Sequence, residues 1–323
     1  MNKSQLRRIR RRKKIRRIRR RILFTIILIV SIVIIFQVFN KIDNLNINFY
    51  KRVEALTGNN ENSAENENKE KIEGEKSDKE ENINILDNSG YSSLEEDINA
   101  DDASEVLPKT MYKWNFYRED GRKIAYLTFD DGPSEHSTER ILDILKENNI
   151  KATFFELGSS IERNYKAKDI LKRVVDEGHA IGSHGYSHDY SKLYPNGIVD
   201  VKAVVKDFKT NDDILKGMLG KDFSTRLIRL PGGHSSWNGT GALDEVLKSM
   251  GIWQVDWNAL NGDAEGKDFP KEVLLSKLKE TVGKQDVVIV LMHDTDYKKG
   301  TVEYLQSAID YLKSEGFEFR TLK

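Results

Sequence analysis

Two adjacent carboxylates, Asp130 and Asp131, end the apolar, β-prone run in the segment YLTFDDGPS. Neighbouring negative charges repel, and each disfavours ionisation of the other. A cation beside the pair would offset that repulsion, whereas on a solvated turn water would screen it. The pair therefore predicts either a cation site or an exposed turn.

The segment SHGYSHD could supply ligands for such a cation. His184 and His188 are four residues apart, so they can lie on one side of a helix or tight loop and bind a metal through imidazole nitrogen. Alone, two histidines at this spacing also suit a surface or a core. With one carboxylate they form a donor set typical of hydrolytic Zn²⁺ or a similar ion, and the neighbouring Asp can take a proton from bound water.

The elements that must position these residues follow a regular alternation. From about Met111 onward, apolar β-prone runs alternate with amphipathic helical ones, which indicates parallel strands joined by helical crossovers. About two hundred residues with roughly seven such repeats fit a TIM-like barrel better than a small open sheet. The predicted strands are 124–129, 152–157, 179–184, 225–230, 253–257, 287–292 and 317–322, and the predicted helices are 137–148, 169–178, 199–219, 241–250, 271–283 and 302–316.

Polar residues follow several of these strands at the point where each one ends. Besides the paired aspartates and the histidines, Arg229, Asp256, Trp257 and His293 have this position. The carboxyl ends of the strands of a β/α barrel share one face, where the active site is built. We therefore expect these side chains to converge on one pocket.

The segments TFDDG, HGYSH, RLPGG, DW and LMH, in this order, resemble the five motifs of the polysaccharide deacetylase family, the NodB-homology group or carbohydrate esterase family 4. The similarity spans about Met111 to Lys323. It implies an α/β fold, a distorted (β/α) TIM-like barrel of about seven strands. It also implies a metal-dependent hydrolase that removes N-acetyl groups from a polysaccharide.

The resemblance assigns roles to the residues around the carboxylate pair. Asp130 matches the general base, and Arg229 matches the arginine that pairs with it. Asp131, His184 and His188 match the three metal ligands. The implied cofactor is a divalent metal, with Zn²⁺ preferred over other divalent transition metals.

The remaining motifs imply the acid and the substrate pocket. His293 matches the general acid, and Asp256 matches the aspartate that orients and tunes it. Trp257 and Leu291 match residues that line the pocket for the acetyl methyl group. Gly232 departs from the common pattern, in which a tyrosine stands at that position; the backbone N–H of the oxyanion site is kept and the aromatic wall is lost.

Other polar and aromatic residues have less specific interpretations. Trp237 could stack on a sugar ring or simply pack. His136 is expected to be exposed and His179 to be structural, while His234 could face the substrate groove. Asp263 is expected to cap or brace a loop near the site.

The N-terminal region predicts a membrane anchor. Residues 1–21 are strongly basic, and the uncharged run 22–39 is long enough to cross about 30 Å of hydrocarbon. A signal peptide has a shorter apolar region and a small-residue cleavage site, which FQVFNKIDNLNINFY lacks. Flanking Lys and Arg stay cytoplasmic, so we expect a single-pass protein of the cell membrane with its catalytic domain outside.

A polar linker is predicted to follow the span. Residues 40–110 include a long stretch rich in Asn, Glu, Lys and Ser. A chain of this composition buries too little apolar surface to offset the entropy lost on ordering. The catalytic domain is then expected over 111–323.

Charge and cysteine content limit the partners. The chain has 52 basic and 52 acidic residues and no cysteine, which excludes disulfides and thiolate metal ligands. The Arg-rich block could be a nucleic-acid arm, but membrane topology and attraction to anionic lipids explain it more simply. We expect no nucleic-acid partner.

An anchored deacetylase beside the cell wall suggests peptidoglycan as substrate, with N-acetylglucosamine the first choice and N-acetylmuramic acid the second. Poly-N-acetylglucosamine, chitin oligomers and acetylated xylan are alternatives within the same chemistry. A non-catalytic wall-binding barrel is the alternative of another class.

Overall fold

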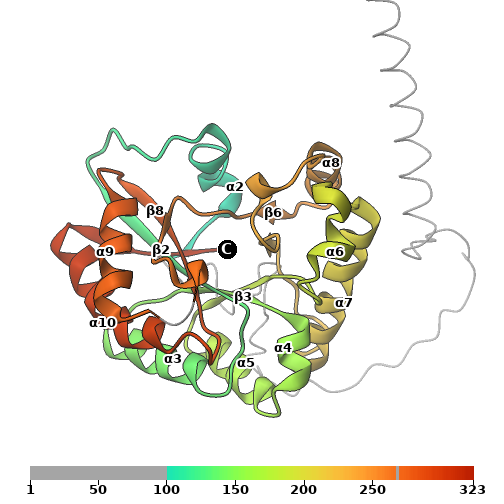
Figure 1. Ribbon diagram of the computed structural model, residues 1–323, viewed down its shortest axis with the longest axis horizontal. Helices are drawn as coiled ribbons and strands as arrows, with labels where there is room; N and C mark the ends of the chain where they lie inside the picture. Colours follow the sequence, from blue (N-terminus) through green and yellow to red (C-terminus); the bar gives the residue numbers. More distant parts are fainter. Residues whose placement is uncertain (1–99, 267–268) are drawn as a thin grey trace, which may run out of the picture. The chain divides into compact units, whose positions relative to one another are not determined.

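The computed structural model describes residues 100–266 and 269–323 (Figure 1). The predicted basic tail (1–21), the predicted span (22–39) and most of the predicted linker (40–110) lie outside the described residues. Among the helices of the described part, none combines the length and the apolar character needed to cross a membrane.

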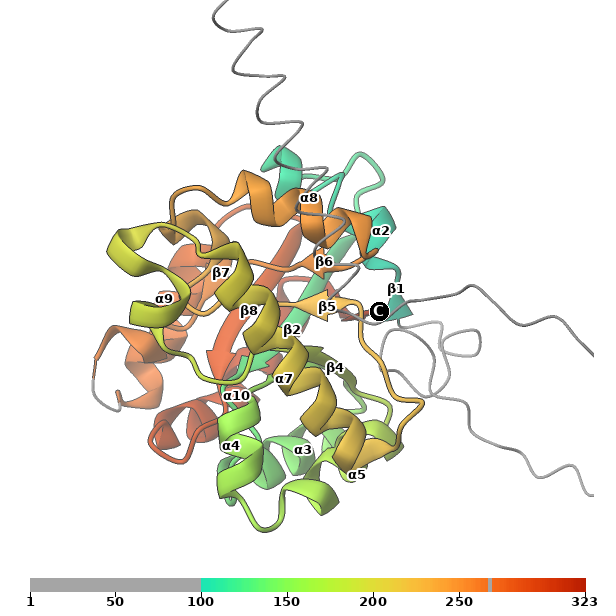
Figure 2. The same ribbon diagram turned by 90° about the vertical axis from the view of Figure 1, so that its right-hand side faces the viewer.

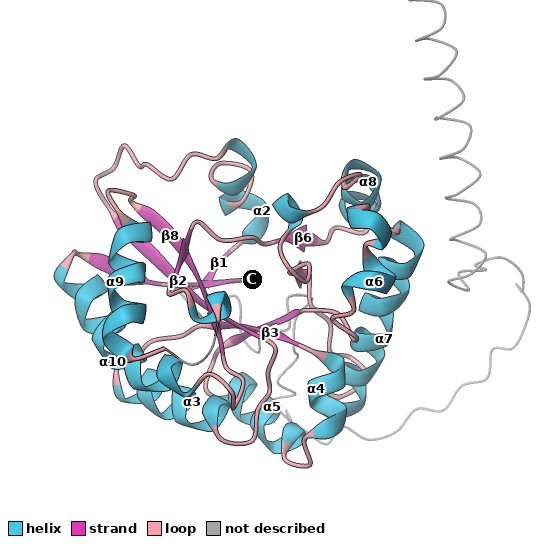
Figure 3. Cartoon of the chain, in the orientation of Figure 1, coloured by secondary structure: helices cyan, strands magenta, loops and turns pink. Residues whose placement is uncertain are grey.

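A curled parallel sheet forms the centre of the fold (Figure 3). Its strands follow the order β6-β5-β4-β3-β2-β8-β7, and β9 pairs with β2 outside this path. The longest pair, β2 and β8, is in register over seven positions, and the apolar run of β8 is buried, as expected of a central parallel strand. The strand bounds are β2 Lys123–Asp130, β3 Thr153–Glu156, β4 Ala180–Ser183, β5 Leu227–Ile228, β6 Trp253–Gln254, β7 Ala259–Leu260, β8 Val287–His293 and β9 Phe317–Phe319.

Helices surround the sheet, as Figure 1 shows. The longer helices bury an apolar stripe; on α5, Ile170, Leu171, Val174 and Val175 are buried, with the spacing of one helix face. The helices are α3 Ser137–Glu147, α4 Gly158–Arg163, α5 Ala167–Asp176, α6 Tyr190–Leu193, α7 Val201–Leu219, α8 Gly241–Ser249, α9 Lys271–Val282 and α10 Lys299–Ser314. The alternation predicted from the sequence is thus confirmed, and short elements such as α4, α6 and β7 are additions to it.

The strands alone do not close the barrel. Within the described residues no backbone pairing joins β6 to β7, the two ends of the sheet. Residues 102–118, here called the N-terminal segment, bridge the gap between β6 and β8. Tyr112 Oη donates to the Gln254 carbonyl of β6 (3.3 Å), and the Phe116 carbonyl accepts from the backbone N–H groups of Asp286 (2.9 Å) and Val287 (3.0 Å) at the start of β8. Figure 2 shows the same neighbourhood of α2 (Ala103–Val106), β6 and α8 from the side.

The predicted linker boundary at residue 110 is wrong, because residues 100–110 belong to the folded domain. Strand β1 (Ala100–Asp101) pairs with β10 (Thr321–Leu322) next to the C-terminus. Arg320 donates to the Asp101 carboxylate through Nε (2.5 Å) and Nη2 (2.6 Å). Leu107 is fully buried. Residues 100–110 pack on the domain through isolated apolar side chains in a polar stretch. Because the spacing of these side chains has no periodicity, the sequence pattern did not predict a folded element there.

Candidate active site

Asp130 and His293 are adjacent at the carboxyl ends of two neighbouring strands. They are register partners at the last position of the β2–β8 pair. Side chains alternate along a strand, so Thr128 and Leu291, two positions earlier on β2 and β8, share their face. The register of a single strand pair therefore positions the predicted base, the predicted acid and one pocket residue together.

Arg229 lies just beyond β5 and is fully buried. Its Nη1 donates to both Asp130 Oδ1 and Thr128 Oγ1, each at 2.7 Å. Nε donates to the Val255 carbonyl (2.8 Å) and Nη2 to the Asp256 carbonyl (3.2 Å). The guanidinium is thus fixed in one orientation, and its charge is fully paired inside the barrel.

Two opposing effects act on the Asp130 carboxylate. Burial disfavours its charged form and raises its pKa, and this effect exceeds the opposing influence of the Arg229 and His293 charges. A bound cation beside Asp130 would add a further positive charge and favour the ionised form. The ionisation of the predicted base is therefore coupled to occupation of the neighbouring triad.

Asp131, His184 and His188 converge from two loops. Asp131 Oδ1 lies 3.6 Å from His184 Nε2 and 3.7 Å from His188 Nε2. The three ligand atoms lie within 4.8 Å of one another. Asp131 and His188 both have positive φ angles, 76° and 53°, an uncommon conformation for residues with a side chain. Such conformations cost free energy and concentrate at functional sites.

The triad passes three tests for a metal site. Asp131 Oδ1 is buried and accepts no hydrogen bond from any described residue. Two ligand atoms bound about 2.0–2.2 Å from a tetrahedral ion stand roughly 3.3–3.6 Å apart, close to the observed spacing. His184 Nδ1 lies 2.8 Å from the Arg229 carbonyl and must donate to it, which leaves the Nε2 lone pair free toward Asp131. The set can therefore hold one metal ion.

Burial keeps His184 in the neutral form that a metal requires. It lowers the pKa of this imidazole to about 3, despite the opposing charge of Asp131. At neutral pH the ring binds no extra proton that a metal would have to displace.

The carboxylate that orients His293 is Asp263, so the expectation that Asp256 does so is wrong. Asp263 Oδ1 lies 2.7 Å from His293 Nδ1, and Oδ2 accepts the His293 backbone N–H at 2.8 Å. Burial alone would lower the pKa of His293, but the charge and hydrogen bond of Asp263 outweigh it and raise the pKa to about 9. Thr301 Oγ1 donates to Asp263 Oδ2 at 2.7 Å and holds the carboxylate in place.

Asp256 instead organises the loop after β5. Its Oδ1 accepts from the His234 backbone N–H (3.0 Å) and from Gln254 Nε2 (2.6 Å). The Asp256 carbonyl also accepts from Arg229. Asp256 therefore acts on the wall of the site. The sequence pattern assigned it to the wrong partner because Asp256 ends a predicted strand, whereas Asp263 follows the short strand β7, which the pattern did not predict.

Two of the predicted pocket residues, Gly232 and Trp257, lie on that wall, whereas Leu291 lies on β8. A Cβ at Gly233 would stand 2.6 Å from Cη2 of Trp257, and one at Gly232 would stand 2.9 Å from Cζ2 of Trp237. Trp237 stacks on Tyr194, with ring centroids 4.1 Å apart, and its Nε1 donates to the Pro231 carbonyl at 2.9 Å. Trp237 is thus a packing residue, and it fills the space beside Gly232 where a larger side chain would extend.

Two residues of α7 shape the histidine loop, and the sequence reading missed them. Asp207 accepts from the backbone N–H groups of Tyr186 (2.7 Å) and Ser187 (3.2 Å). Asn211 is fully buried, and its Nδ2 donates to the Glu156 carbonyl and to Ser183 Oγ, both at 2.8 Å. A buried asparagine within an apolar helix face was the signal in the sequence.

Comparison with known proteins agrees with this geometry. The family profile described as "Polysaccharide deacetylase" matches residues 117–255. A peptidoglycan-N-acetylglucosamine deacetylase of Bacillus cereus is 32% identical over 206 residues, which cover 61% of this chain and 68% of that protein. The peptidoglycan-N-acetylglucosamine deacetylase PgdA of Listeria monocytogenes is 34% identical over 203 residues, 62% of this chain but only 38% of that protein.

The solved structures show the same relationship. The structure of a Streptococcus mutans CE4 esterase superposes with a TM-score of 0.63 at 38% identity, covering 70% of this chain and 92% of that one. The residues matched by the family profile include the strands that carry the carboxylate pair, the histidine loop and Arg229. The chain belongs to the polysaccharide deacetylase family.

Proposed function

We propose that the protein is a metal-dependent hydrolase that removes the N-acetyl group from N-acetylglucosamine units of peptidoglycan. The observation that carries the proposal is the placement of a buried base, Asp130, and a protonated acid, His293, on adjacent strands beside a three-ligand site. Binding alone would not require all three parts. The names of the relatives support peptidoglycan as the polymer.

The residues of the site divide the reaction between them. Asp131, His184 and His188 would hold a divalent cation, which would lower the pKa of a water and polarise the acetamide carbonyl. Asp130 accepts the proton of the attacking water while Arg229 holds its carboxylate in one orientation. We assign the backbone N–H of Gly232 as a donor to the developing oxyanion, because the family motif that this segment resembles supplies such a donor.

Breakdown of the tetrahedral intermediate needs an acid. An amine is a poor leaving group until it is protonated, and His293 with its raised pKa carries a proton at neutral pH. His293 donates that proton to the nitrogen as the carbon–nitrogen bond breaks, and acetate leaves. Asp263 keeps the ring oriented and charged until transfer.

We assign Zn²⁺ as the metal, because two imidazole nitrogens and one carboxylate with open positions suit a hydrolytic zinc site. We further propose that residues 22–39 anchor the protein in the cell membrane, with the basic tail inside and the domain outside. An outer domain on a linker would reach the wall polymer, and no nucleic-acid partner is needed to explain the basic block.

The substrate assignment is tested by mass spectrometry of purified peptidoglycan digested after incubation with the full-length, metal-loaded chain. Loss of one acetyl mass from glucosamine units, with muramic acid units unchanged, is the expected result. Loss from muramic acid alone, or loss only from chitin oligomers, poly-N-acetylglucosamine or acetylated xylan offered in parallel, would overturn the assignment. No release from any polymer would favour a non-catalytic wall-binding barrel.

A further inference from the structure

A second concave site lies between the N-terminal segment and helix α8. This groove, here called the seam groove, has a volume of about 630 Å³, and its walls include Tyr112, Trp114, Trp253, His234, Asp244 and Glu245. None of these residues is a member of the metal triad or the Asp130–His293 pair. The groove has the size of a small-ligand site, with apolar walls and a few polar groups.

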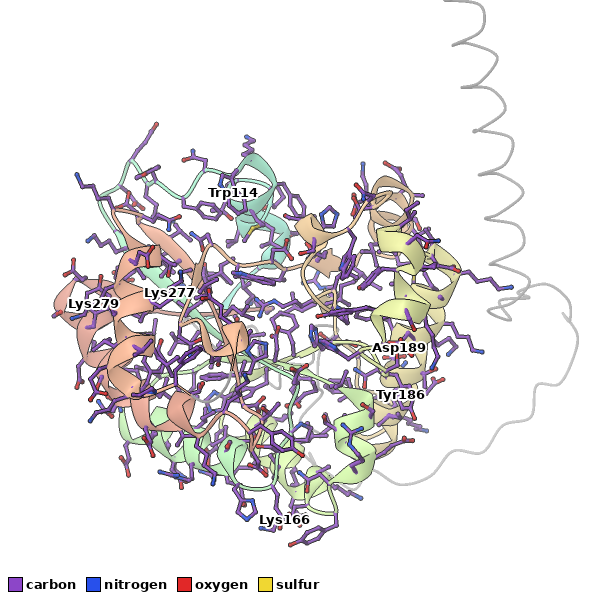
Figure 4. The ribbon with its side chains drawn as sticks, viewed as in Figure 1. Trp114, Lys166, Tyr186, Asp189, Lys277 and Lys279 are labelled. Carbon is purple, nitrogen blue, oxygen red and sulfur yellow. The ribbon has the colours of Figure 1, made fainter. Side chains whose placement is uncertain are left out.

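Aromatic rings form one wall of the seam groove. Tyr112 and Trp253 are nearly parallel, with centroids 6.2 Å apart and an interplanar angle of 23°. Trp114 is 64% exposed and makes a T-shaped contact with Phe116 (5.2 Å, 82°), so most of its ring is accessible to a ligand. Figure 4 labels Trp114 on the N-terminal segment, on the same side of the ring of helices as α8.

Polar groups that suit hydroxyls form the opposite wall. His234 Nε2 pairs with Asp244 Oδ1 at 2.8 Å, and this hydrogen bond raises the pKa of the imidazole. The Glu245 side chain is exposed, and its carboxylate forms no ion pair or hydrogen bond with another described residue. A carboxylate accepts hydrogen bonds from hydroxyl groups, and the aromatic faces attract the weakly positive C–H face of a pyranose ring.

The loop after β5 connects the seam groove to the catalytic site. On one side, Gly233 packs against Trp257 of the catalytic pocket. On the other side, His234 and Ser235 line the seam groove. Asp256 joins the two sides, since its Oδ1 accepts the His234 backbone N–H and its carbonyl accepts from Arg229. One loop thus forms a wall of both sites, so an extended ligand can contact both.

We propose that the seam groove binds a further saccharide unit of the same polysaccharide chain whose N-acetyl group is hydrolysed at the triad. This inference rests on the proposed function and extends it from one sugar to the polymer. An aromatic wall facing carboxylates favours a neutral sugar over a phosphate or an acidic ligand, which Asp244 and Glu245 would repel. The groove then adds affinity for long substrates without taking part in the chemistry.

The test compares the full-length, metal-loaded chain with Trp114→Ala on the disaccharide and the hexasaccharide of N-acetylglucosamine. Tyr117→Ala is the matched control, because Tyr117 lies on the same segment, is 65% exposed and does not line the groove. We expect Trp114→Ala to raise KM for the hexasaccharide about 3- to 10-fold, the loss of one aromatic contact, with kcat unchanged. The disaccharide KM should not change, and Tyr117→Ala should match the wild type on both.

Equal effects of Trp114→Ala on both lengths, or no effect on either, would overturn the proposal. Calorimetric titration of the hexasaccharide into Asp130→Asn separates this outcome from failure of the proposed function. Binding that weakens when Trp114→Ala is added supports the groove even if no substrate is hydrolysed. Hexasaccharide binding that is insensitive to Trp114→Ala, or no binding, contradicts it.

Discussion

Asp263 is hydrogen-bonded to His293 twice, at the ring Nδ1 (2.7 Å) and at the backbone N–H (2.8 Å). These hydrogen bonds fix the orientation of the His293 ring through Nδ1 and leave Nε2 free to contact the substrate. Thr301 Oγ1 (2.7 Å) and Asn261 Nδ2 (3.3 Å) both donate to Asp263 Oδ2 and hold the carboxylate in turn. The acid of the site is therefore positioned from the loop that contains Asp263, and not from the strand end that carries Asp256.

Replacing Asp263 with Asn should move the alkaline limit of activity. His293 donates a proton only while protonated, and the Asp263 charge raises its pKa to about 9. Without that charge the pKa falls toward its ordinary value near 6.5, so the alkaline limb of the kcat–pH profile should shift down by about one to two pH units. Asp256→Asn is the control, since it leaves the pair intact. An unchanged limb in Asp263→Asn, or a shift in Asp256→Asn, would contradict this assignment.

The same pair should contribute to stability in a defined pH window. The folded-state pKa of His293 is raised, so its contribution is fully present below pH 6.5 and is lost as the pH rises through about 9. We expect the free energy of unfolding to fall less steeply over this window in Asp263→Asn than in the wild type. Denaturant titrations at several pH values measure the slope, and parallel curves for the two proteins would oppose the prediction.

Arg229→Met should destabilise the domain by about 3–5 kcal/mol, because it leaves the buried Asp130 carboxylate without its charged partner. The double variant Arg229→Met with Asp130→Asn should recover part of this loss, since no buried charge then remains. Urea unfolding of the two single variants and the double variant gives the coupling free energy. If the unfolding free-energy changes of the two single variants simply add in the double variant, the ion pair does not explain the burial of Arg229.

The metal site should depend on the loop that Asp207 holds. Asp207→Ala removes the acceptor of two backbone N–H groups between the predicted ligands His184 and His188, so metal affinity should fall roughly 10- to 100-fold. Asp213→Ala on the same helix is the control, because that side chain is 60% exposed and, among the described residues, pairs only with Lys209. Competition with a chromophoric chelator measures both affinities. Equal affinity in the two variants would rule out a positioning role for Asp207.

A side chain at position 232 and the Trp237 ring should compete for the same space. Gly232→Tyr places a side chain 2.9 Å from the Trp237 ring at a φ of 80°, and overpacking of this kind costs about 1–3 kcal/mol. Adding Trp237→Ala should restore part of the stability by opening that space. Thermal unfolding of the single and double variants tests the coupling. A Gly232→Tyr variant as stable as the wild type would show that the two positions do not compete.

The strand–helix alternation was predictable because each element has its own apolar periodicity. The β2–β8 pair also placed Asp130 and His293 together, since both lie at the last residue of a strand. Closure of the ring by residues 102–118 was not predictable, because Tyr112 and Phe116 act through single contacts that only the folded sheet provides.

The carboxylate partner of His293 could not be predicted from the sequence either. Asp256 ends a predicted strand, which made it the expected partner, whereas Asp263 lies seven residues later in a turn whose path depends on β7 (Ala259–Leu260). The predicted ligands, base and arginine needed no such turn. Each lies at the end of a strand or in the loop that follows it, and the structure brings all of them together.

The most direct test of the account is acetate release from purified peptidoglycan by the full-length chain and its Asp130→Asn variant, at matched metal content and with and without a chelator. We predict that the wild type releases acetate, that the chelator stops release, and that Asp130→Asn binds metal normally but loses at least about 100-fold in rate, the usual share of a general base. Release by Asp130→Asn at the wild-type rate, or wild-type release that survives complete removal of the metal, would contradict the mechanism.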